Sequence, residues 1–133
     1  MNLFTVITVT YNAEDTLLRT LKSVQEQTYK NVEHIIVDGN STDGTVDLIK
    51  KHTKQNTRWI SENDKGIYDA MNKATTMAHG EYVCYLNAGD AFYEKETDEK
   101  LVSAAQQYKH PDILYGETVI VDNTGKILHN RRL

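Results

Sequence analysis

The sequence predicts a single α/β domain in which a mostly parallel sheet is flanked by helices. Short runs rich in β-branched and aromatic residues alternate with segments whose apolar residues recur at helical spacing. This alternation is typical of parallel strands joined by right-handed helical crossovers. The chain of 133 residues is also long enough for one domain with a core of its own.

Five runs are expected to be strands, at residues 3–10, 32–37, 57–61, 82–86 and about 113–121. The run at 82–86, Tyr-Val-Cys-Tyr-Leu, is apolar and aromatic throughout, so we expect a buried central strand around which the sheet is organised. Residues 122–125, Asp-Asn-Thr-Gly, are a hairpin signal, and residues 126–129 are the expected return strand. This C-terminal β-hairpin is expected to add an antiparallel edge and make the sheet mixed.

The first two helices are expected to follow the first two strands. Asn12 is predicted to be the N-cap of the first helix. The apolar face of that helix is expected to hold Leu17, Leu18, Leu21 and Val24. The second helix is expected at residues 45–54, with Asp43 and Gly44 as its cap and turn.

Two further helices are expected on either side of the run at 82–86. The one before it covers residues 67–78, with Gly80 as its C-terminal stop. The one after it covers residues 97–108. Its inward face is expected to hold Leu101, Val102, Ala105 and Tyr108.

The composition is that of an ordinary globular domain, with 39% hydrophobic and 26% charged residues. A net charge of −4 argues against nucleic-acid binding, which needs a basic face. The single cysteine, Cys84, is expected to be a small buried core residue, in keeping with a reducing, cytoplasmic setting. No signal peptide or membrane-spanning run is visible. The five histidines lack metal-ligand spacing and are expected to be structural or surface residues.

Four of the expected strands end in polar residues, at 10–12, 38–43, 62–66 and 87–90. Because the carboxyl ends of parallel strands meet at one edge of a sheet, these loops are expected to form an acidic cleft there, where such sheets bind ligands. Carboxylates gather where a cation offsets their mutual repulsion. The expected occupant is therefore a polyphosphate ligand bridged by a divalent metal.

The last of these loops, Asn87-Ala88-Gly89-Asp90, has two interpretations. All four residue types are favoured in turns, so the loop can be a turn and nothing more. Oxygen ligands beside small residues, which let a phosphate or metal approach the backbone, equally suit Mg²⁺ or Mn²⁺. The three other polar loops at the same edge favour the metal-binding interpretation.

Common phosphate-binding signatures are absent from the sequence. There is no Gly-x-x-x-x-Gly-Lys-Ser/Thr motif, and no Gly-x-Gly-x-x-Gly follows the first strand. That strand ends in Tyr11-Asn12. It therefore lacks the paired acids of a phospho-accepting receiver domain and the Gly-rich basic loop of a nucleotidyltransferase.

Four segments, in order, resemble the family 2 glycosyltransferases, which have a GT-A fold. They are residues 7–12 (Ile-Thr-Val-Thr-Tyr-Asn), 35–45 (Ile-Ile-Val-Asp-Gly-Asn-Ser-Thr-Asp-Gly-Thr), 61–72 (Ser-Glu-Asn-Asp-Lys-Gly-Ile-Tyr-Asp-Ala-Met-Asn) and 86–90 (Leu-Asn-Ala-Gly-Asp). The resemblance, closest to bacterial polysaccharide-building enzymes, implies transfer from a nucleotide-sugar donor, a UDP-sugar, to a saccharide or lipid-linked acceptor. It also implies a cytoplasmic location, with room for peripheral association with the inner membrane.

The resemblance implies a set of nucleotide-binding residues and one metal ligand. The nucleotide-binding set is Thr10, Tyr11, Asn12, Asp38, Asp64, Lys65, Gly66, Asn87 and Ala88. Within this set, Asp38 would accept a hydrogen bond from the ring N–H of a uracil-like base. Asp90 would hold Mn²⁺ or Mg²⁺ on the diphosphate. Asn87 stands where many members carry an acid, and it would supply a neutral oxygen.

Inverting transfer needs a general base that takes the proton of the acceptor hydroxyl. The family carries this base after the last strand seen here, so residues 1–133 are expected to be a nucleotide-sugar-binding domain truncated before the base and most of the acceptor site. Two functions therefore stay open. One is a glycosyltransferase, and the other is a binding module that holds a nucleotide sugar without transferring it.

Overall fold

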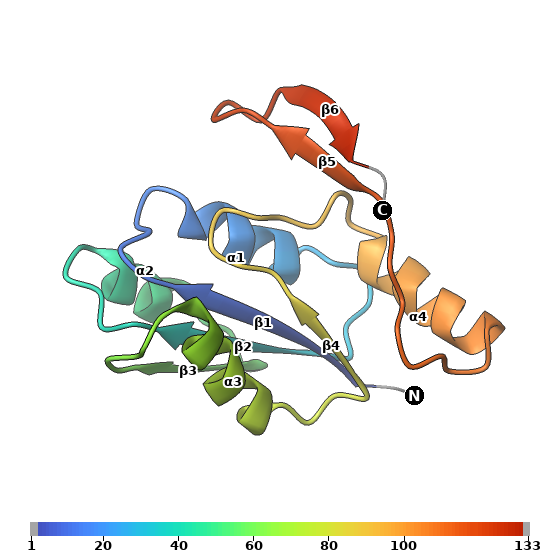
Figure 1. Ribbon diagram of the computed structural model, residues 1–133, viewed down its shortest axis with the longest axis horizontal. Coiled ribbons are helices and arrows are strands. Elements are labelled where there is room, and N and C mark those ends of the chain that lie inside the picture. The colour runs from blue at the N-terminus through green and yellow to red at the C-terminus, as the bar shows by residue number, and fades with distance from the viewer. Residues whose placement is uncertain (1–2, 132–133) are drawn as a thin grey trace.

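The computed structural model describes residues 3–131, in which a parallel sheet lies between layers of helices (Figure 1). The elements are β1 (Phe4–Thr10), α1 (Leu17–Gln25), β2 (Val32–Asp38), α2 (Thr45–His52), β3 (Thr57–Ser61), α3 (Ile67–Met77), β4 (Tyr82–Tyr85), α4 (Thr97–Gln107), β5 (Thr118–Val121) and β6 (Ile127–Arg131). The main sheet has the order β3-β2-β1-β4, and every neighbouring pair is parallel. The predicted α/β fold class is confirmed.

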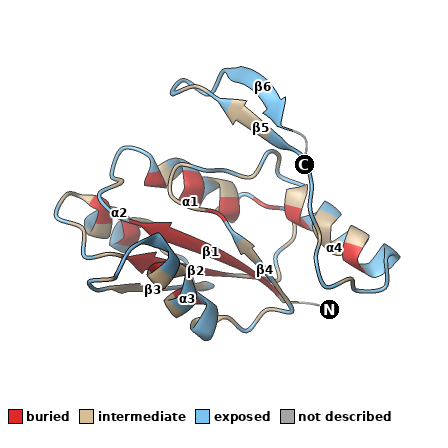
Figure 2. Ribbon diagram, in the orientation of Figure 1, coloured by how far each residue is buried: buried red, intermediate tan, exposed pale blue. Residues whose placement is uncertain are grey.

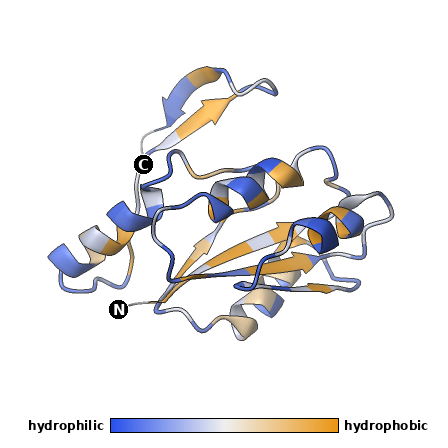
Figure 3. Ribbon diagram, turned by 180° about the vertical axis from the view of Figure 1, so that it is seen from behind, coloured by the Kyte–Doolittle hydropathy of each residue, from blue (hydrophilic) through white to orange (hydrophobic). Residues whose placement is uncertain are grey.

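The two central strands, β1 and β2, are buried on both faces because helices cover both sides of the sheet (Figure 2). α3 packs Ala70 and Ala74 on one face, against a cluster that includes Ile7 and Ile35. α1 and α2 pack on the other face, around Ile36. Figure 3 shows hydrophobic residues along these strands and hydrophilic residues in the loops that follow them. The β-branched runs therefore form the centre of the sheet, as their composition predicts.

β4 lies at an edge of the sheet, and this corrects the prediction of a buried central strand. Its residues alternate between half-buried and exposed, and Val83 and Tyr85 are 36% and 47% exposed. Cys84 is half-buried, and burial raises the pKa of its thiol to about 11. Among the described strands only β1 pairs with β4. An uninterrupted apolar run predicts that a strand is buried, but it does not identify the element that packs on it.

The predicted hairpin forms, but it is not an edge of the main sheet. β5 and β6 pair with each other as a separate antiparallel sheet that stands apart in Figure 1. The turn is the predicted one, because the Asp122 carboxylate accepts hydrogen bonds from the Thr124 and Lys126 amides and Gly125 has a φ of 88°. Residues 113–117 are not in a strand, so the chain reaches the hairpin without pairing to β4. The four-stranded sheet is therefore parallel throughout and not mixed.

Three helix predictions also need correction. α1 begins at Leu17 with Thr16 at its N-cap, so Asn12 is not the cap. α3 ends at Met77, and a Cβ on Gly80 would lie 2.7 Å from the backbone nitrogen of Thr5. Gly80 therefore allows a close approach to β1 and does not stop the helix. In α4, Tyr108 follows the last helical residue and is 66% exposed.

Candidate functional site

The carboxyl ends of the four parallel strands bring the predicted loops together. Thr10 pairs with Asp38 across β1 and β2, and Asp38 pairs with Ser61 across β2 and β3. On the other side of β1, the amide of Ala88 donates to the carbonyl of Val9 over 3.2 Å. Residues far apart in sequence therefore share one edge of the sheet, which is where open α/β sheets bind ligands.

Asn12 joins the loop after β1 to the loop after β2. Its backbone has a φ of 46°, and its amide donates to Ser41 Oγ over 2.8 Å. Its side-chain oxygen accepts from the Thr42 amide, also over 2.8 Å. Asp43, in the same loop, accepts from the amide of Thr45 over 3.0 Å, but the N-cap of α2 is Gly44, so Asp43 is not the cap as predicted and lies one residue before it. Asn12 therefore stabilises the loops after β1 and β2, and its side chain does not cap a helix.

Asp38 is completely buried at the end of β2. Its carboxylate accepts hydrogen bonds from the Ser41 amide over 2.9 Å, from Ser41 Oγ over 2.5 Å and from Ser61 Oγ over 2.7 Å. A carboxylate offers about four acceptor positions, so internal donors take three of them and about one is left. Sequence reasoning missed Ser41 and Ser61, although both are hydroxyl residues in the segments whose residues resemble the family.

A pocket of about 230 Å³ opens between the end of β1 and the start of α3. Its lining includes the predicted residues Thr10, Tyr11, Asp64 and Gly66. This volume is below the roughly 300–1,000 Å³ of pockets that enclose a small ligand, so it fits one part of a ligand, such as a base. Lys65 lies beside the pocket and is exposed, and its side chain does not line it.

Two glycines shape this pocket. A Cβ on Gly39 would lie 2.8 Å from Asp64 Oδ2 and 3.5 Å from Tyr11 Cδ2, so the loops after β1, β2 and β3 touch at this point. Gly66 has a φ of 109° and begins the turn into α3, and its amide donates to Asp64 Oδ1 over 2.9 Å. The positive φ therefore favours glycine at position 66, and a side chain at position 39 would have to displace the Asp64 carboxylate.

Two buried oxygen atoms at this edge have no hydrogen-bond partner among the described residues. They are Thr10 Oγ1 at the end of β1 and Asn87 Oδ1 just after β4. Buried polar atoms are nearly always paired, so an orphan oxygen in a site is an unfilled position for a donor. Both residues belong to the predicted nucleotide-binding set.

Asp90 ends the loop after β4, and its carboxylate is exposed and makes no hydrogen bond or ion pair with any residue that the structure describes. Residues 3–131 contain no group of three or more His, Cys, Asp or Glu side chains placed to hold a metal ion. Asp90 and Asn87 share one turn, in which the Asp90 amide donates to the Asn87 carbonyl over 2.9 Å, and a single free carboxylate can serve Mg²⁺ or Mn²⁺, which often take one or two protein carboxylates and fill their other positions with phosphate oxygens and water.

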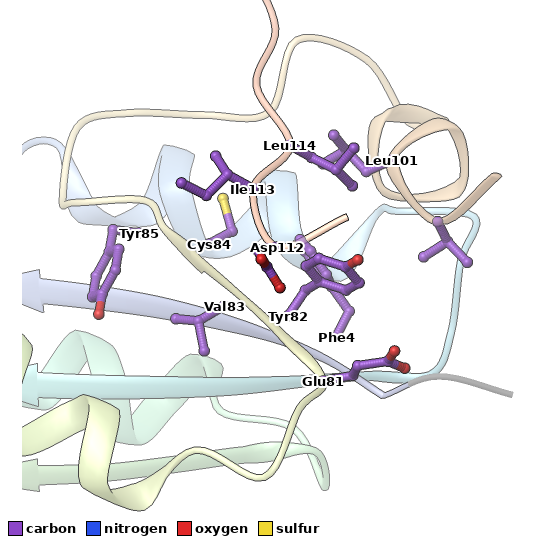
Figure 4. A pocket seen from close by; sticks show the side chains of 11 residues that line it. Phe4, Glu81, Tyr82, Val83, Cys84, Tyr85, Leu101, Asp112, Ile113 and Leu114 are labelled. Carbon is purple, nitrogen blue, oxygen red and sulfur yellow. The ribbon is translucent and has the colours of Figure 1, made fainter. Parts of the chain in front are cut away.

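A larger cavity, of about 520 Å³, lies along the free side of β4 (Figure 4). It is lined by apolar residues such as Leu101 and Ile113, with the carboxylates of Glu81 and Asp112 at its rim. None of the predicted site residues lines it. We place the candidate site at the smaller pocket, because the converging loops, the orphan oxygens and the free carboxylate all lie at that edge.

The position of these loops, at the carboxyl edge of an open parallel sheet, defines a domain of the nucleotide-binding α/β class. A sequence profile described as "Glycosyl transferase family 2" matches residues 5–132, so the chain belongs to that family. Its fold is GT-A, because the solved structures that it resembles are GT-A glycosyltransferases. No helix within residues 3–131 is long and apolar enough to cross a membrane.

Two curated relatives illustrate the similarity in sequence. A "PGL/p-HBAD biosynthesis glycosyltransferase" of Mycobacterium tuberculosis is 31% identical over 121 residues, which are 89% of this chain and 47% of the relative. A UDP-Glc:alpha-D-GlcNAc-diphosphoundecaprenol beta-1,3-glucosyltransferase of Escherichia coli is 41% identical over 91 residues, 68% of this chain and 36% of that protein. The chain thus spans less than half the length of these relatives.

Two solved structures illustrate the similarity in fold. Staphylococcus aureus TarS 1–349 in complex with UDP-GlcNAc matches with a TM-score of 0.75 and 28% identity, over 80% of this chain and 32% of that one. The mannosyltransferase PcManGT from Pyrobaculum calidifontis, in complex with GDP-Man and Mn²⁺, matches with a TM-score of 0.72 and 26% identity, over 92% of this chain and 36% of that one.

Proposed function

We propose that this chain is the donor-binding part of a glycosyltransferase, and that it binds a UDP-sugar together with Mn²⁺ or Mg²⁺ at the carboxyl edge of β1–β4. The observation that carries the proposal is the pair of orphan buried oxygens, Thr10 Oγ1 at the end of β1 and Asn87 Oδ1 in the loop after the neighbouring strand β4. A nucleotide sugar supplies base N–H and sugar hydroxyl donors that satisfy such acceptors. The acceptor substrate in this proposal is a saccharide or a lipid-linked saccharide.

The pocket beside Tyr11 receives the base in this proposal. Tyr11 is 63% exposed, so its ring is free to pack on a flat base, while Asn12 keeps the backbone beneath it in place. The last acceptor position of the Asp38 carboxylate takes the ring N–H of the uracil, which must reach below the surface to do so. Asp64, Lys65 and Gly66 then face the nucleotide from the start of α3.

The opposite end of the edge holds the diphosphate. Asp90 and Asn87 are the residues that would hold the divalent cation, and Ala88 leaves room for the phosphates to approach the backbone. When bound, the cation supplies positive charge that stabilises the departing diphosphate. The domain boundaries and the general base are also part of the proposal. We assign the base to the part of the relatives that this chain does not span.

Nucleotide preference tests the base pocket. We expect calorimetric titration in the presence of Mn²⁺ to give tighter binding of UDP than of GDP, because the pocket of about 230 Å³ suits a single-ring base better than a purine. Tighter binding of GDP would indicate a GDP-sugar as the donor and would not affect the assignment to the family. Failure of every nucleoside diphosphate to bind would contradict the proposed function.

A second candidate function, nucleotide-sugar binding without transfer, uses the same site. It is favoured because Asp64, which is half-buried, is the only acid among the described residues that line the pocket. Release of UDP from a UDP-sugar, measured with a saccharide acceptor for this chain with and without the C-terminal part of a relative added, separates the two functions, because only the donor-binding part of a glycosyltransferase should gain turnover from the addition. The proposal expects no turnover by residues 1–133 alone, and turnover at an ordinary enzymatic rate would place a base within them.

A further inference from the structure

The fully buried residues of α1 are three apolar side chains, Leu17, Leu21 and Val24, and one polar residue, Thr20. Thr20 is completely buried, and its hydroxyl donates to the carbonyl of Asp90 over 2.6 Å and accepts from the amide of Gly89 over 2.9 Å. The neighbouring Arg19 donates from Nη2 to the carbonyl of Gly89 over 2.7 Å. Together Thr20 and Arg19 hold both sides of the Gly89–Asp90 peptide.

Two further side chains, Ser23 in α1 and Gln27 just after it, hold the chain beyond Asp90. Ser23 Oγ accepts from the amide of Phe92 over 3.2 Å. Gln27, which is 2% exposed, donates to the carbonyl of Glu94 over 2.8 Å and accepts from the amide of Asp98 over 2.9 Å. Residues 89–98 are therefore fixed along a rigid helix by a row of side-chain hydrogen bonds, although they contain no regular structure until α4 begins.

Gly89 explains why this loop needs such support. Its φ of 99° is a conformation that only glycine adopts easily, and glycine also gives the unbound backbone more freedom than any other residue. Without contacts on both sides, the carboxylate of Asp90 would sample many positions. The hydroxyl of Thr20 restricts this freedom at the amide of Gly89 and at the carbonyl of Asp90, and water cannot replace it because Thr20 is completely buried.

We propose that Thr20 is a positioning residue that fixes the Asp90 carboxylate and thereby sets how strongly a divalent metal enhances nucleotide binding. This inference rests on the proposed function, in which Asp90 holds the metal. Thr20 touches neither metal nor nucleotide in this assignment, and it acts through the backbone of Asn87, Gly89 and Asp90. Arg19 supports the same peptide from the surface.

The test compares two substitutions of Thr20 with a matched control elsewhere. Thr20→Val keeps the shape and removes the hydroxyl, and Thr20→Ser keeps the hydroxyl. Thr5→Val is the control, because Thr5 is also completely buried, donates to Glu33 Oε1 over 2.7 Å and accepts from the Gly80 amide over 2.9 Å, but lies at the opposite end of β1. The measured quantity is the ratio of UDP affinities with and without Mn²⁺.

We expect the parent chain to show an enhancement within the range of about 5- to 150-fold that is typical of coupled sites. Thr20→Val should lose most of this enhancement while keeping its metal-free UDP affinity, and Thr20→Ser should restore it. Thr5→Val should lower the thermal midpoint at least as much as Thr20→Val and keep the enhancement. Loss of the enhancement in both valine variants would show a general effect of stability and would overturn the inference.

Arg19→Met tests the same inference without changing a buried residue. Arg19 is exposed, so the fold should tolerate the change, and we expect a partial loss of the enhancement. If Thr20→Val does not fold, this variant decides alone. Full enhancement in every folded variant of Arg19 and Thr20 would overturn the inference and leave the proposed function intact. Absence of enhancement in the parent would instead contradict the proposed metal site, and the inference with it.

Discussion

At the scale of single residues, Asp38 shows how one buried carboxylate organises the site. It accepts three hydrogen bonds from Ser41 and Ser61 and so joins the end of β2 to the loop after it and to β3. Its place after a β-branched strand was visible in the sequence. Its serine partners were not, because hydrogen bonds between loops leave no periodic pattern.

We predict that Asp38→Asn weakens both folding and UDP binding. The amide keeps one acceptor oxygen and loses the charge, so the free energy of unfolding should fall by about 2 kcal/mol. Ser61→Ala is the matched control: it removes one internal bond, should cost about 1 kcal/mol, and should leave UDP affinity unchanged. Urea unfolding and calorimetry measure the two effects. Equal UDP affinity for Asp38→Asn and the parent would remove Asp38 from the base pocket.

Asp98, in the first turn of α4, is completely buried, and neither of its carboxylate oxygens has a hydrogen-bond partner among residues 3–131. Burial raises its pKa from 3.8 to about 7. Between these values the folded state binds more protons than the unfolded state, so this group makes the protein less stable as the pH rises. His34 acts in the opposite direction, because burial lowers its pKa from 6.5 to about 4 and its contribution to stability is lost as the pH falls through that window.

Asp98→Asn should therefore remove the contribution of Asp98 to the pH dependence of stability and leave that of His34. We expect the free energy of unfolding of the variant, relative to the parent, to rise between about pH 4 and 7, at up to about 1.4 kcal/mol per pH unit. Urea unfolding of both proteins across this range measures the difference. A difference that does not change with pH would show that Asp98 is not a buried acid that ionises near neutrality.

At the scale of elements, the sequence located most of the sheet and the start of three helices. The predicted strand at residues 57–61 is β3, and α2, α3 and also α4 begin at Thr45, Ile67 and Thr97 as expected. The prediction for β4 was wrong about its position, because apolar composition indicates burial without identifying the neighbour. The same limitation hid Thr20: one hydroxyl among the apolar residues of α1 was the signal, but its partners lie about 70 residues further along the chain.

Gly66 allows a direct test of how the loop before α3 is built. Its φ is 109° and a Cβ would meet no atom within 4 Å, so Gly66→Ala should act through backbone strain alone. The expected loss in free energy of unfolding is about 1–2 kcal/mol. Gly116→Ala is the control, since a Cβ there also meets nothing and the backbone does not have a positive φ. Equal thermal midpoints for the two variants would contradict the strained turn.

At the scale of the whole molecule, the structure is a GT-A sheet whose carboxyl edge carries the predicted nucleotide-binding residues. The four loops at that edge touch through Asn12, Gly39 and Ala88. The order of the motifs in the sequence predicted this convergence, because parallel strands place their loops on one side. The sequence did not predict the separate hairpin, since a strand pattern does not specify which sheet the strand joins.

The central claim is that this edge binds a nucleoside diphosphate and a divalent metal together, through Asp90. The most direct test is calorimetric titration of UDP with and without Mn²⁺, on the parent chain, on Asp90→Asn and on Asp47→Asn, a control that changes an exposed acid of α2. We predict an enhancement of about 5- to 150-fold in the parent and in Asp47→Asn, and none in Asp90→Asn. A UDP affinity that does not respond to Mn²⁺ in the parent, or a full response in Asp90→Asn, would contradict the claim and leave residues 87–90 as a turn.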